Sequence, residues 1–455
     1  MTKKKHNHNH SQKPFAAIVL AAGRGTRMKS DMPKVLHPIA GRAMISYLLA
    51  SVDELSPSRT IVVVGPDMDV VKQTVAPASI AVQEQPLGTG NAVACALQKL
   101  GDFDGNVLIL FGADPLIRPE TMHDLLDKRD ASHAVAVLGF RPDDAGAYGR
   151  LLVDDHGRLD AIVEAKDATP EQLRIPYCNS GVMAVDGALL PELIAKLKND
   201  NAKSEYYLTD IIALARASGH SCTWMEGDAN ELIGVDSRHD LALTEGLLQT
   251  RLRENAMMNG ATLIAPETVY FSFDTELGRD VVIEPHVVFG SGVKIADGVT
   301  VKSFSHIEGA TIENGATIGP YARLRPGADI GVNSKIGNFV EIKNARLDKG
   351  AKVSHLSYIG DAFIGTNANI GAGTITCNYD GFSKSKTTIG AGAFIGSNTA
   401  LVAPVSVGDG AIVGAGSVIS KNVDRDALAV TRAQQKQVSG WAEKFRDKQT
   451  KQKKD

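Results

Sequence analysis

Aliphatic side chains recur at every sixth position through much of the second half of the chain, and this period limits the possible folds more than any other feature. The three runs are Ile283, Phe289, Ile295, Val301 and Ile307; Ile312, Ile318, Leu324, Ile330, Ile336 and Ile342; and Ile389, Ile395, Leu401, Val407, Val413 and Ile419. The second run is one residue out of phase with the first, and in the third the residues four positions further on are small or short. Two residues per hexad therefore point inward. This repeat predicts a parallel β-helix, in which each hexad forms one flat side and each coil stacks on the next.

The repeat is broken between Thr374 and Thr388. An insertion that interrupts a solenoid projects from it and commonly carries function. The flat sides and open ends of such a solenoid also favour packing of copies side by side, so we expect a homotrimer.

The first half of the chain has a different pattern, in which short apolar runs alternate with stretches of helical spacing. The expected strands are 16–21, 61–64, 107–111 and 134–138, and the expected helices are 44–53, 90–100 and 119–128. Such alternation predicts an α/β domain, with a mostly parallel sheet covered by helices on both faces. The expected domains are a tail at 1–13, the α/β domain at 14–240, a charged helical linker at 241–260, the β-helix at 261–432 and a basic tail at 433–455.

Composition limits the setting in which the protein works. A net charge of −3 does not suit nucleic-acid binding, which needs many uncompensated Lys and Arg. No run of about 18 apolar residues suggests a membrane span, and the start of the chain lacks the apolar segment of a signal peptide. The four cysteines are far apart and show no metal-ligand or disulfide spacing. We expect a cytoplasmic protein that binds neither nucleic acid nor membrane. The alternating histidines of the N-terminal tail either have no native role or chelate a metal.

The sharpest local signal in the first half is a glycine-rich turn after the first strand, Ala22-Gly23-Arg24-Gly25-Thr26-Arg27-Met28, followed by Pro33-Lys34. Glycines there let backbone N–H groups approach a phosphate, and Arg27 and Lys34 add positive charge where a triphosphate would lie. A dinucleotide fingerprint would need glycine in place of Met28, and a P-loop would need Gly-Lys-Ser/Thr, so neither is supported. The remaining alternative is that the glycines only close a turn between strand and helix.

Several motifs together resemble the sugar-phosphate nucleotidyltransferases. They are Leu20-Ala21-Ala22-Gly23 with the turn that follows, Gln83 with Gly88-Thr89-Gly90, Tyr148-Gly149-Arg150, the string at 162–168, and Asn179-Ser180-Gly181. With a hexapeptide β-helix behind them, over about 15–432, they are similar to the bifunctional N-acetylglucosamine-1-phosphate uridyltransferases and glucosamine-1-phosphate acetyltransferases, in which the β-helix is left-handed. The resemblance implies that UTP, glucosamine 1-phosphate and acetyl-CoA are converted to UDP-N-acetylglucosamine, a precursor of cell wall and lipopolysaccharide.

The same resemblance assigns roles in the α/β domain. It implies that Arg27 and Lys34 are catalytic and that UTP and the UDP-sugar are bound by Leu20, Ala21, Ala22, Gly23, Lys34, Gln83, Gly88, Thr89, Gly149, Glu164, Asn179 and Asp236, with Gly149, Glu164 and Asn179 on the sugar.

The resemblance also implies a Mg²⁺ site, and the sequence departs from the family pattern at both ligands. Where the family has Gly-Asp-x-Pro-Leu, this chain reads Gly112-Ala113-Asp114-Pro115-Leu116, so the carboxylate comes one residue late. In a continuing strand this shift would turn the side chain to the opposite face, whereas a loop at the strand end can adjust, and we expect Asp114 to bind the metal. The second ligand, an Asn in the family, is Asp236 here, which keeps an oxygen and adds negative charge. Two protein oxygens together with substrate phosphates suit Mg²⁺.

The repeat half carries polar residues that a purely structural solenoid does not need. Glucosamine 1-phosphate brings an ammonium group, so amide formation needs a general base near neutral pH, for which histidine is suited. By resemblance, the base is His355, in the string 354–361. The strings 323–327, 340–343 and 371–381 also match the family. By the same resemblance Arg325, Lys343 and Tyr358 bind the sugar phosphate, Asn369 and Asn378 orient the amine, and Ala372, Asn378, Tyr379, Ser397, Ala415 and Arg432 line the acetyl-CoA site, with neighbouring chains of the trimer sharing it.

Two other functions stay open at this point. One is a nucleotidyltransferase of single activity, in which the β-helix only forms trimers and His355 is a surface histidine. The other is a regulatory subunit in which the α/β domain only binds ligand, a reading favoured by the shift of Asp114. The basic tail is expected to be partly disordered, with Trp441 docked locally.

Overall fold

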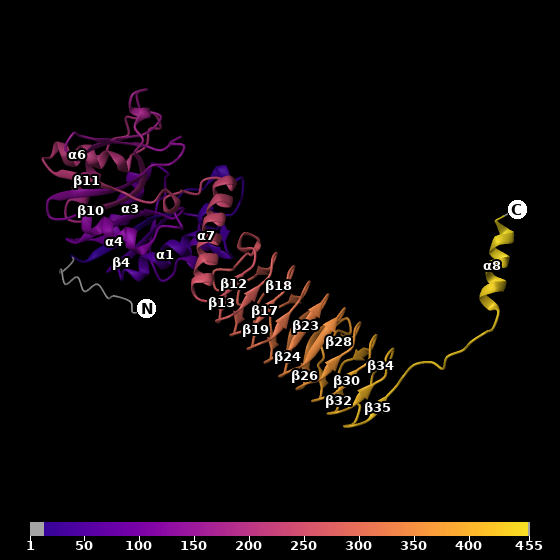
Figure 1. Ribbon diagram of the computed structural model, residues 1–455. Helices are drawn as coiled ribbons and strands as arrows, with labels where there is room; N and C mark the ends of the chain where they lie inside the picture. The colour runs from indigo at the N-terminus through magenta and orange to yellow at the C-terminus, as the bar shows by residue number, and fades with distance from the viewer. Residues whose placement is uncertain (1–12, 454–455) are drawn as a thin grey trace. The chain divides into compact units, whose positions relative to one another are not determined.

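The computed structural model describes residues 13–453, which form two compact units that meet between Arg251 and Leu252 (Figure 1). Helix α7 (Arg238–Met258) spans that division. Residues 1–12 of the expected N-terminal tail, with its histidines, lie outside the described residues. The finer domain limits given above stay predictions. None of the helices within residues 13–453 is long and apolar enough to cross a membrane.

The first unit is built on a nine-stranded sheet whose main path runs β11-β7-β10-β6-β1-β4-β5. The path comprises β1 (Phe15–Leu20), β4 (Arg59–Val64), β5 (Ser79–Val82), β6 (Asn106–Phe111), β7 (His133–Phe140), β10 (Cys178–Asp186) and β11 (Ser221–Glu226). Strand β1 pairs in parallel with both β4 and β6, whereas β10 lies antiparallel between β6 and β7. Strands β8 (Arg150–Val153) and β9 (Leu159–Val163) extend the sheet from β10, and β2 (Pro38–Ile39) pairs with β3 (Arg42–Ala43).

Helices cover both faces of this sheet, as the sequence pattern predicts. Alternate residues of β1 enter two different cores, because successive side chains of a strand point to opposite faces. Ala16, Ile18 and Leu20 pack with residues of α3 (Thr89–Leu100), α5 (Leu190–Ala195) and α6 (Ile211–Ala217). Ala17 and Val19 pack with residues of α1 (Met44–Glu54), α2 (Asp69–Thr74) and α4 (Pro119–Lys128). Each large aliphatic side chain buried in this way contributes about 1.5–3 kcal/mol. The carboxyl ends of the central strands are thereby held firmly, and the polar loops of the first site begin there.

The second unit is a parallel β-helix, and it confirms the fold predicted from the six-residue period. One sheet contains β12 (Thr262–Leu263), β14 (Val282–Ile283), β17 (Thr300–Val301), β20 (Thr317–Ile318), β23 (Lys335–Asn338), β25 (Lys352–His355), β27 (Asn369–Ile370), β30 (Phe394–Ile395), β33 (Ile412–Val413) and β35 (Leu428–Ala429). The other contains β13 (Glu276–Leu277), β15 (Val288–Phe289), β16 (Lys294–Ile295), β18 (His306–Ile307), β19 (Ala310–Ile312), β21 (Arg323–Leu324), β22 (Ala328–Ile330), β24 (Glu341–Leu347), β26 (Tyr358–Ile364), β28 (Ile375–Cys377), β29 (Thr387–Ile389), β31 (Ala400–Val402), β32 (Val405–Val407) and β34 (Val418–Ile419).

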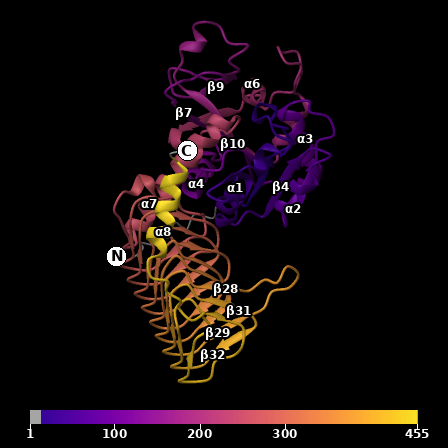
Figure 2. The same ribbon diagram turned by 90° about the vertical axis from the view of Figure 1, so that its right-hand side faces the viewer.

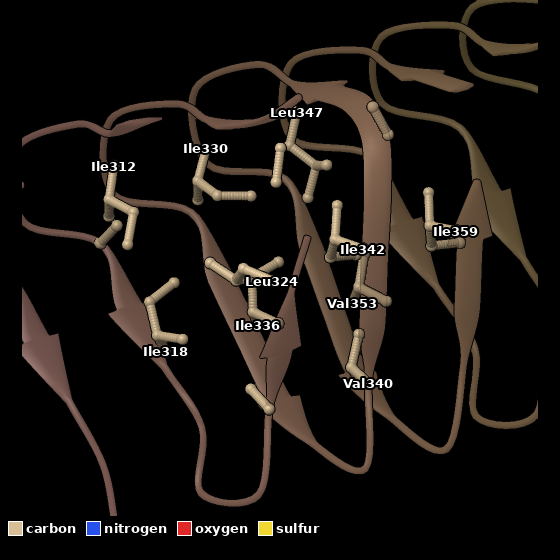
Figure 3. Packing of buried hydrophobic residues seen from close by; sticks show 14 of the residues in the cluster. Ile312, Ile318, Leu324, Ile330, Ile336, Val340, Ile342, Leu347, Val353 and Ile359 are labelled. Atoms are coloured by element: carbon tan, nitrogen blue, oxygen red, sulfur yellow. The ribbon is translucent and has the colours of Figure 1, made fainter. Parts of the chain in front are cut away.

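The inward aliphatic residues stack in columns along the solenoid (Figure 3). The strand registers define one column per side of the coil: Ile312, Ile330 and Leu347; Ile318, Ile336 and Val353; and Leu324, Ile342 and Ile359. All of these side chains are buried. Since each coil rests on the one before it, the core is continuous, and residues about one coil apart in the sequence become neighbours.

Of the insertion predicted at 374–388, residues 378–386 lie between β28 and β29 and project from the coils (Figure 2). Tyr379 and Lys384 face each other across an antiparallel bridge at its base, and Phe382 near its tip is almost fully exposed.

The C-terminal tail contains helix α8 (Trp441–Gln452), which the sequence pattern did not predict. Gly440 precedes the helix in a left-handed conformation, and the strong helix formers Ala, Glu, Lys, Arg and Gln dominate the segment. The Trp441 ring stacks on Phe445 of the same helix with 5.2 Å between centroids and stays more than half exposed. The contact that the tryptophan makes is therefore a local one, within its own helix.

Candidate functional site

The glycine-rich turn of the first unit brings Arg27 and Lys34 together. Gly25 has φ +66°, and a Cβ there would lie 2.5 Å from the Cβ of Lys34, so only glycine fits. The turn leads into the short helix η1 (Thr26–Met28), which carries Arg27, and Lys34 begins the short helix η2 (Lys34–Leu36).

Both cations pair with one carboxylate, that of Asp236, which lies near the end of the first unit in the sequence. Lys34 Nζ donates to Asp236 Oδ1 at 2.7 Å, and Arg27 Nη2 lies 2.9 Å from Asp236 Oδ2. The Lys34 side chain is mostly buried, whereas that of Asp236 is 41% exposed. The three motif residues thus converge at the end of β1, as the resemblance implies for a triphosphate site.

Asp114 lies beside this cluster in spite of its shifted sequence position. The chain turns directly after β6, where Asp114 N–H donates to Phe111 O, and Val235 N–H then donates to Ala113 O and joins the turn to the segment of Asp236. Burial raises the pKa of Asp114 to about 7, with Asp236 adding to the rise and Lys34 opposing it. The displacement of Asp114 by one residue in the sequence therefore leaves its carboxylate in the site, because β6 has ended before this residue.

The donor chemistry of the pair fits a hard divalent cation. Asp114 is a buried carboxylate with a neighbouring carboxylate in Asp236, and both border one cavity, so the repulsion between them would be relieved by a cation. Among residues 13–453, no cluster of three or more acidic, His or Cys residues is arranged for a metal, so substrate phosphates would have to complete the coordination.

The cavity at these residues has a volume of about 420 Å³. It is lined by eight of the predicted residues, Arg27, Lys34, Thr89, Asp114, Gly149, Glu164, Asn179 and Asp236. The predicted residues Leu20, Ala21, Ala22, Gly23, Gln83 and Gly88 do not line it. Of these, Leu20 and Ala21 are buried in the sheet, so their side chains serve the core. The amide of Gln83 donates to Gly88 O at 3.0 Å and to Asn91 Oδ1 at 2.9 Å, and so holds the loop before α3.

The same cavity is also lined by the predicted sugar-binding residues Gly149, Glu164 and Asn179. Burial raises the pKa of Glu164, an effect opposed by the charge of Lys203 and by a hydrogen bond from Thr209. Asn179 N–H donates to Gly149 O at 2.8 Å, and its side-chain oxygen accepts from Gly181 N–H at 2.9 Å. Lys203, Tyr207 and Thr209 also line the cavity and were missed from sequence, because they follow a loop with no motif spacing.

The second site lies on the β-helix around His355, at the end of β25. The Nδ1 atom of His355 lies 2.5 Å from Asn338 Oδ1, in the preceding coil. An amide oxygen only accepts, so this contact assigns the ring proton to Nδ1 and leaves the Nε2 lone pair free. Sequence reasoning missed Asn338, because it lies 17 residues before His355 and not at a multiple of six.

The predicted sugar-phosphate residues lie on the sheet face next to this corner. Arg325 follows β21 and donates to Glu341 Oε1 at 2.9 Å. Glu341 and Tyr358 are register partners in β24 and β26. Lys343, also in β24, has its Nζ 3.9 Å from Asp361 Oδ2. Lys343 and Tyr358 therefore belong to neighbouring strands of one sheet, and Arg325 directly follows the strand that pairs with β24 on its other side. Asn369 lies instead in β27, where its register partner is Lys352, three residues before His355.

The predicted acetyl-CoA residues divide into two places. Ala372, Ser397 and Ala415 lie one above another in successive coils, and each precedes a residue with positive φ. Asn338 and His355 occupy the same position in the two coils before Ala372. Arg432 donates to Ala415 O at 2.7 Å and so joins this column. Asn378 and Tyr379 lie instead where the insertion begins; the Asn378 side chain is buried against Asp361, and that of Tyr379 is exposed.

Comparison with known proteins agrees with this division. Residues 17–174 match the family model of the MobA-like NTP transferase domain, and residues 309–344 and 386–421 match that of the bacterial transferase hexapeptide repeats. Proteins named bifunctional protein GlmU are similar over nearly the whole chain. The one from Paramagnetospirillum magneticum is 60% identical, over 96% of this chain and 97% of its own length. The protein from Rhodospirillum rubrum is 60% identical, over 95% of this chain and 97% of its own length. The protein from Zymomonas mobilis is 52% identical, over 97% of this chain and 99% of its own length.

The fold and the two sites define a class, a nucleotidyltransferase joined to a hexapeptide-repeat acyltransferase. Within this class the chain belongs to the GlmU family of bifunctional proteins. It is a transferase with uridylyltransferase and N-acetyltransferase activities, and the two alternatives left open by the sequence are not supported.

Proposed function

We propose that the cavity of the first unit is the uridylyl-transfer site and that the His355 face of the β-helix is the acetyl-transfer site. Acetyl-CoA acetylates glucosamine 1-phosphate, and the product then reacts with UTP to give UDP-N-acetylglucosamine and pyrophosphate. The observation that carries the proposal is the convergence of Arg27, Lys34, Asp114 and Asp236 on a single cavity from three separate motifs.

In the uridylyl step, a phosphate oxygen of N-acetylglucosamine 1-phosphate attacks the α-phosphorus of UTP in line, and pyrophosphate leaves. Such reactions depend on positioning and charge neutralisation more than on covalent help from the protein. Arg27 and Lys34 supply positive charge beside the triphosphate, and Glu164 and Asn179 hold the sugar. Mg²⁺, held by Asp114 and Asp236, would neutralise charge on the phosphate oxygens.

In the acetyl step, His355 acts as the general base. With its proton on Nδ1 held by Asn338, its Nε2 accepts a proton from the substrate ammonium. The free amine then attacks the thioester carbonyl and the C–N bond forms; as the C–S bond breaks, the nitrogen loses its second proton, and the departing thiolate of coenzyme A takes up a proton to become the free thiol. Arg325, Lys343 and Tyr358 bind the phosphate, Asn369 and Asn378 orient the amine, and Ala372, Tyr379, Ser397, Ala415 and Arg432 contact acetyl-CoA.

A homotrimer is supported by a ladder of aromatic side chains along one corner of the β-helix. His286, Phe304, Tyr321 and Phe339 stack on one another with centroids 4.9–5.2 Å apart. The three rings from Phe304 onward remain about half exposed. A contiguous apolar ridge of this kind is typical of an interface, and neighbouring copies would bury it. The four free cysteines accord with a place in the cytoplasm.

The test supplies UTP, acetyl-CoA and glucosamine 1-phosphate with Mg²⁺ and follows pyrophosphate and free thiol separately. His355→Ala should abolish thiol release while uridylyl transfer from supplied N-acetylglucosamine 1-phosphate continues. Asp114→Ala should abolish pyrophosphate release while thiol release continues. Full uridylyl transfer by Asp114→Ala would refute the metal-ligand assignment.

A further inference from the structure

Asp361 occupies a corner of the β-helix beside the proposed acetyl-transfer site and was not among the residues predicted from sequence. The register pairs Lys343 with Gly360 and Ala345 with Ala362, so Asp361 stacks directly on Asn344 of the preceding coil. Asn378 follows 17 residues later and lies against the opposite side of the same carboxylate. A short polar column, Asn344–Asp361–Asn378, therefore runs along this corner.

Both oxygens of this carboxylate are engaged. Oδ1 accepts from Asn344 Nδ2 at 2.5 Å, and Oδ2 accepts from Asn378 Nδ2. An ionised carboxylate can only accept, so it fixes the flip of the Asn378 amide with the NH₂ group toward Asp361. The Asn378 Oδ1 atom therefore points away from Asp361 and is available as an acceptor.

Two lysines complete the cluster. Lys343 Nζ lies 3.9 Å from Asp361 Oδ2, and Lys384 of the insertion lies against Lys343. The close approach of Lys343 and the repulsion of its charge lower the pKa of Lys384, while Asp361 opposes that effect. Burial by itself raises the pKa of Asp361, but hydrogen bonds from Asn344 and Asn378 and the charge of Lys343 outweigh it, so the pKa lies below its usual value. The carboxylate is therefore ionised at neutral pH.

The corner itself does not need an acidic side chain. The equivalent positions of the two coils before Asn344 are Gly309 and Gly327, both in the left-handed conformation that Asp361 adopts at φ +48°. Glycine meets this backbone requirement at no steric cost, whereas a buried carboxylate carries a desolvation cost. The three coils directly before Asn344 have glycine at this position, Gly292, Gly309 and Gly327, so the polar column begins with Asn344.

We infer that Asp361 is a positioning residue for acetyl transfer, which fixes the flip of the Asn378 amide and so presents Asn378 Oδ1 to the substrate amine. The inference rests on the acetyl-transfer site proposed above. Asp361 acts through this side chain and does not itself touch the reacting atoms.

The test uses the full-length Asp361→Gly variant, since glycine is already accommodated at this corner. We expect kcat for thiol release to fall about 10- to 100-fold, because the amide that orients the amine loses its fixed flip. The KM for glucosamine 1-phosphate should not rise, because the two lysines keep their charge and lose their counter-ion. Uridylyl transfer by the same preparation and the thermal unfolding of the β-helix should match the wild type. A merely structural role would instead raise KM and lower the unfolding temperature.

A double-mutant cycle separates positioning from other effects. In an Asn378→Ala background, Asp361→Gly should have little further effect on kcat. Asn344→Ala is the matched control, because it removes the other amide of the column and should leave kcat unchanged. If Asp361→Gly does not fold, the near-isosteric Asp361→Asn carries the same comparison. A wild-type kcat in the folded variant, or an equal loss with and without Asn378, would overturn the inference. Absence of thiol release by the wild type would instead refute the proposed function.

Discussion

Lys34 and Asp236 lie 202 residues apart in the sequence, yet their side chains form a 2.7 Å hydrogen bond, and both line the cavity of the first unit. Arg27 takes the other oxygen of the same carboxylate. The resemblance places an asparagine at position 236, so the additional negative charge of this chain is neutralised by the two cations that the triphosphate would use. Nucleotide binding must therefore break these ion pairs, and a cation at Asp236 would replace them.

Asp236→Asn should alter nucleotide and metal binding in opposite directions. Without a divalent cation, UTP should bind about 2- to 10-fold more tightly, since partly exposed ion pairs of this kind contribute about 0.2–1 kcal/mol each. Affinity for Mg²⁺ should fall, because one charged ligand becomes neutral. Calorimetric titrations with UTP in chelator, and then with Mg²⁺, measure both effects. Asp102→Asn, an exposed aspartate before β6, is the charge-matched control and should change neither.

Asp114→Asn should stabilise the metal-free protein, and the gain should grow with pH. The folded-state pKa of Asp114 is raised to about 7 from 3.8, so the folded state holds a proton that the unfolded state has lost between these values. The wild type therefore loses stability as pH rises from about 4 to about 7, whereas the asparagine variant does not. Denaturant unfolding in chelator at pH 5 and pH 8 should show an additional gain of about 1–3 kcal/mol at the higher pH. An equal gain at both values would contradict this assignment.

Much of the architecture was predictable because its physical causes are local. The period of six places one residue such as Ile318 or Ile336 on each side of each coil, and the burial of those residues determines the fold. The position of Asp114 depends on where β6 ends, and the sequence predicts that end only approximately. The sequence could not show that the turn from Phe111 to Asp114 and the hydrogen bond from Val235 bring this carboxylate to Asp236.

The residues missed around His355 show where sequence reasoning ends. Asn338 and Asp361 act across coils, and their partners lie 17 residues away and not at a multiple of six. Several coils repeat after 18 residues, but the coils of Asn338 and Asn344 and those that follow them repeat after 17, because only five residues separate the inward Ile342 and Leu347. Lys384 approaches Lys343 only because the insertion bends back at the bridge from Tyr379, and nothing periodic predicts that contact.

Gly88→Ala should damage the nucleotide site by displacing the start of α3. Gly88 has φ +105°, and a Cβ there would lie 2.7 Å from Tyr206 O, a backbone atom that cannot move aside cheaply. We expect a loss of about 2–4 kcal/mol in stability and a higher KM for UTP. Denaturant unfolding and uridylyl kinetics measure the two effects. Gly246→Ala, in an open position on α7, is the matched control and should be neutral or stabilise by about 0.5–1 kcal/mol.

Asn338→Ala should slow acetyl transfer without affecting uridylyl transfer. The amide oxygen of Asn338, 2.5 Å from His355 Nδ1, both orients the ring and keeps the proton off Nε2, the nitrogen that must receive it from the substrate. Without this acceptor the ring can rotate, and the tautomer with the proton on Nε2 becomes accessible, so part of the population has no base. We expect kcat for thiol release to fall about 10- to 100-fold. Asn314→Ala, an exposed asparagine of an earlier coil, should retain full activity. Unchanged kcat in Asn338→Ala would mean that the imidazole is oriented by substrate alone, and His355 would then need no partner in the protein.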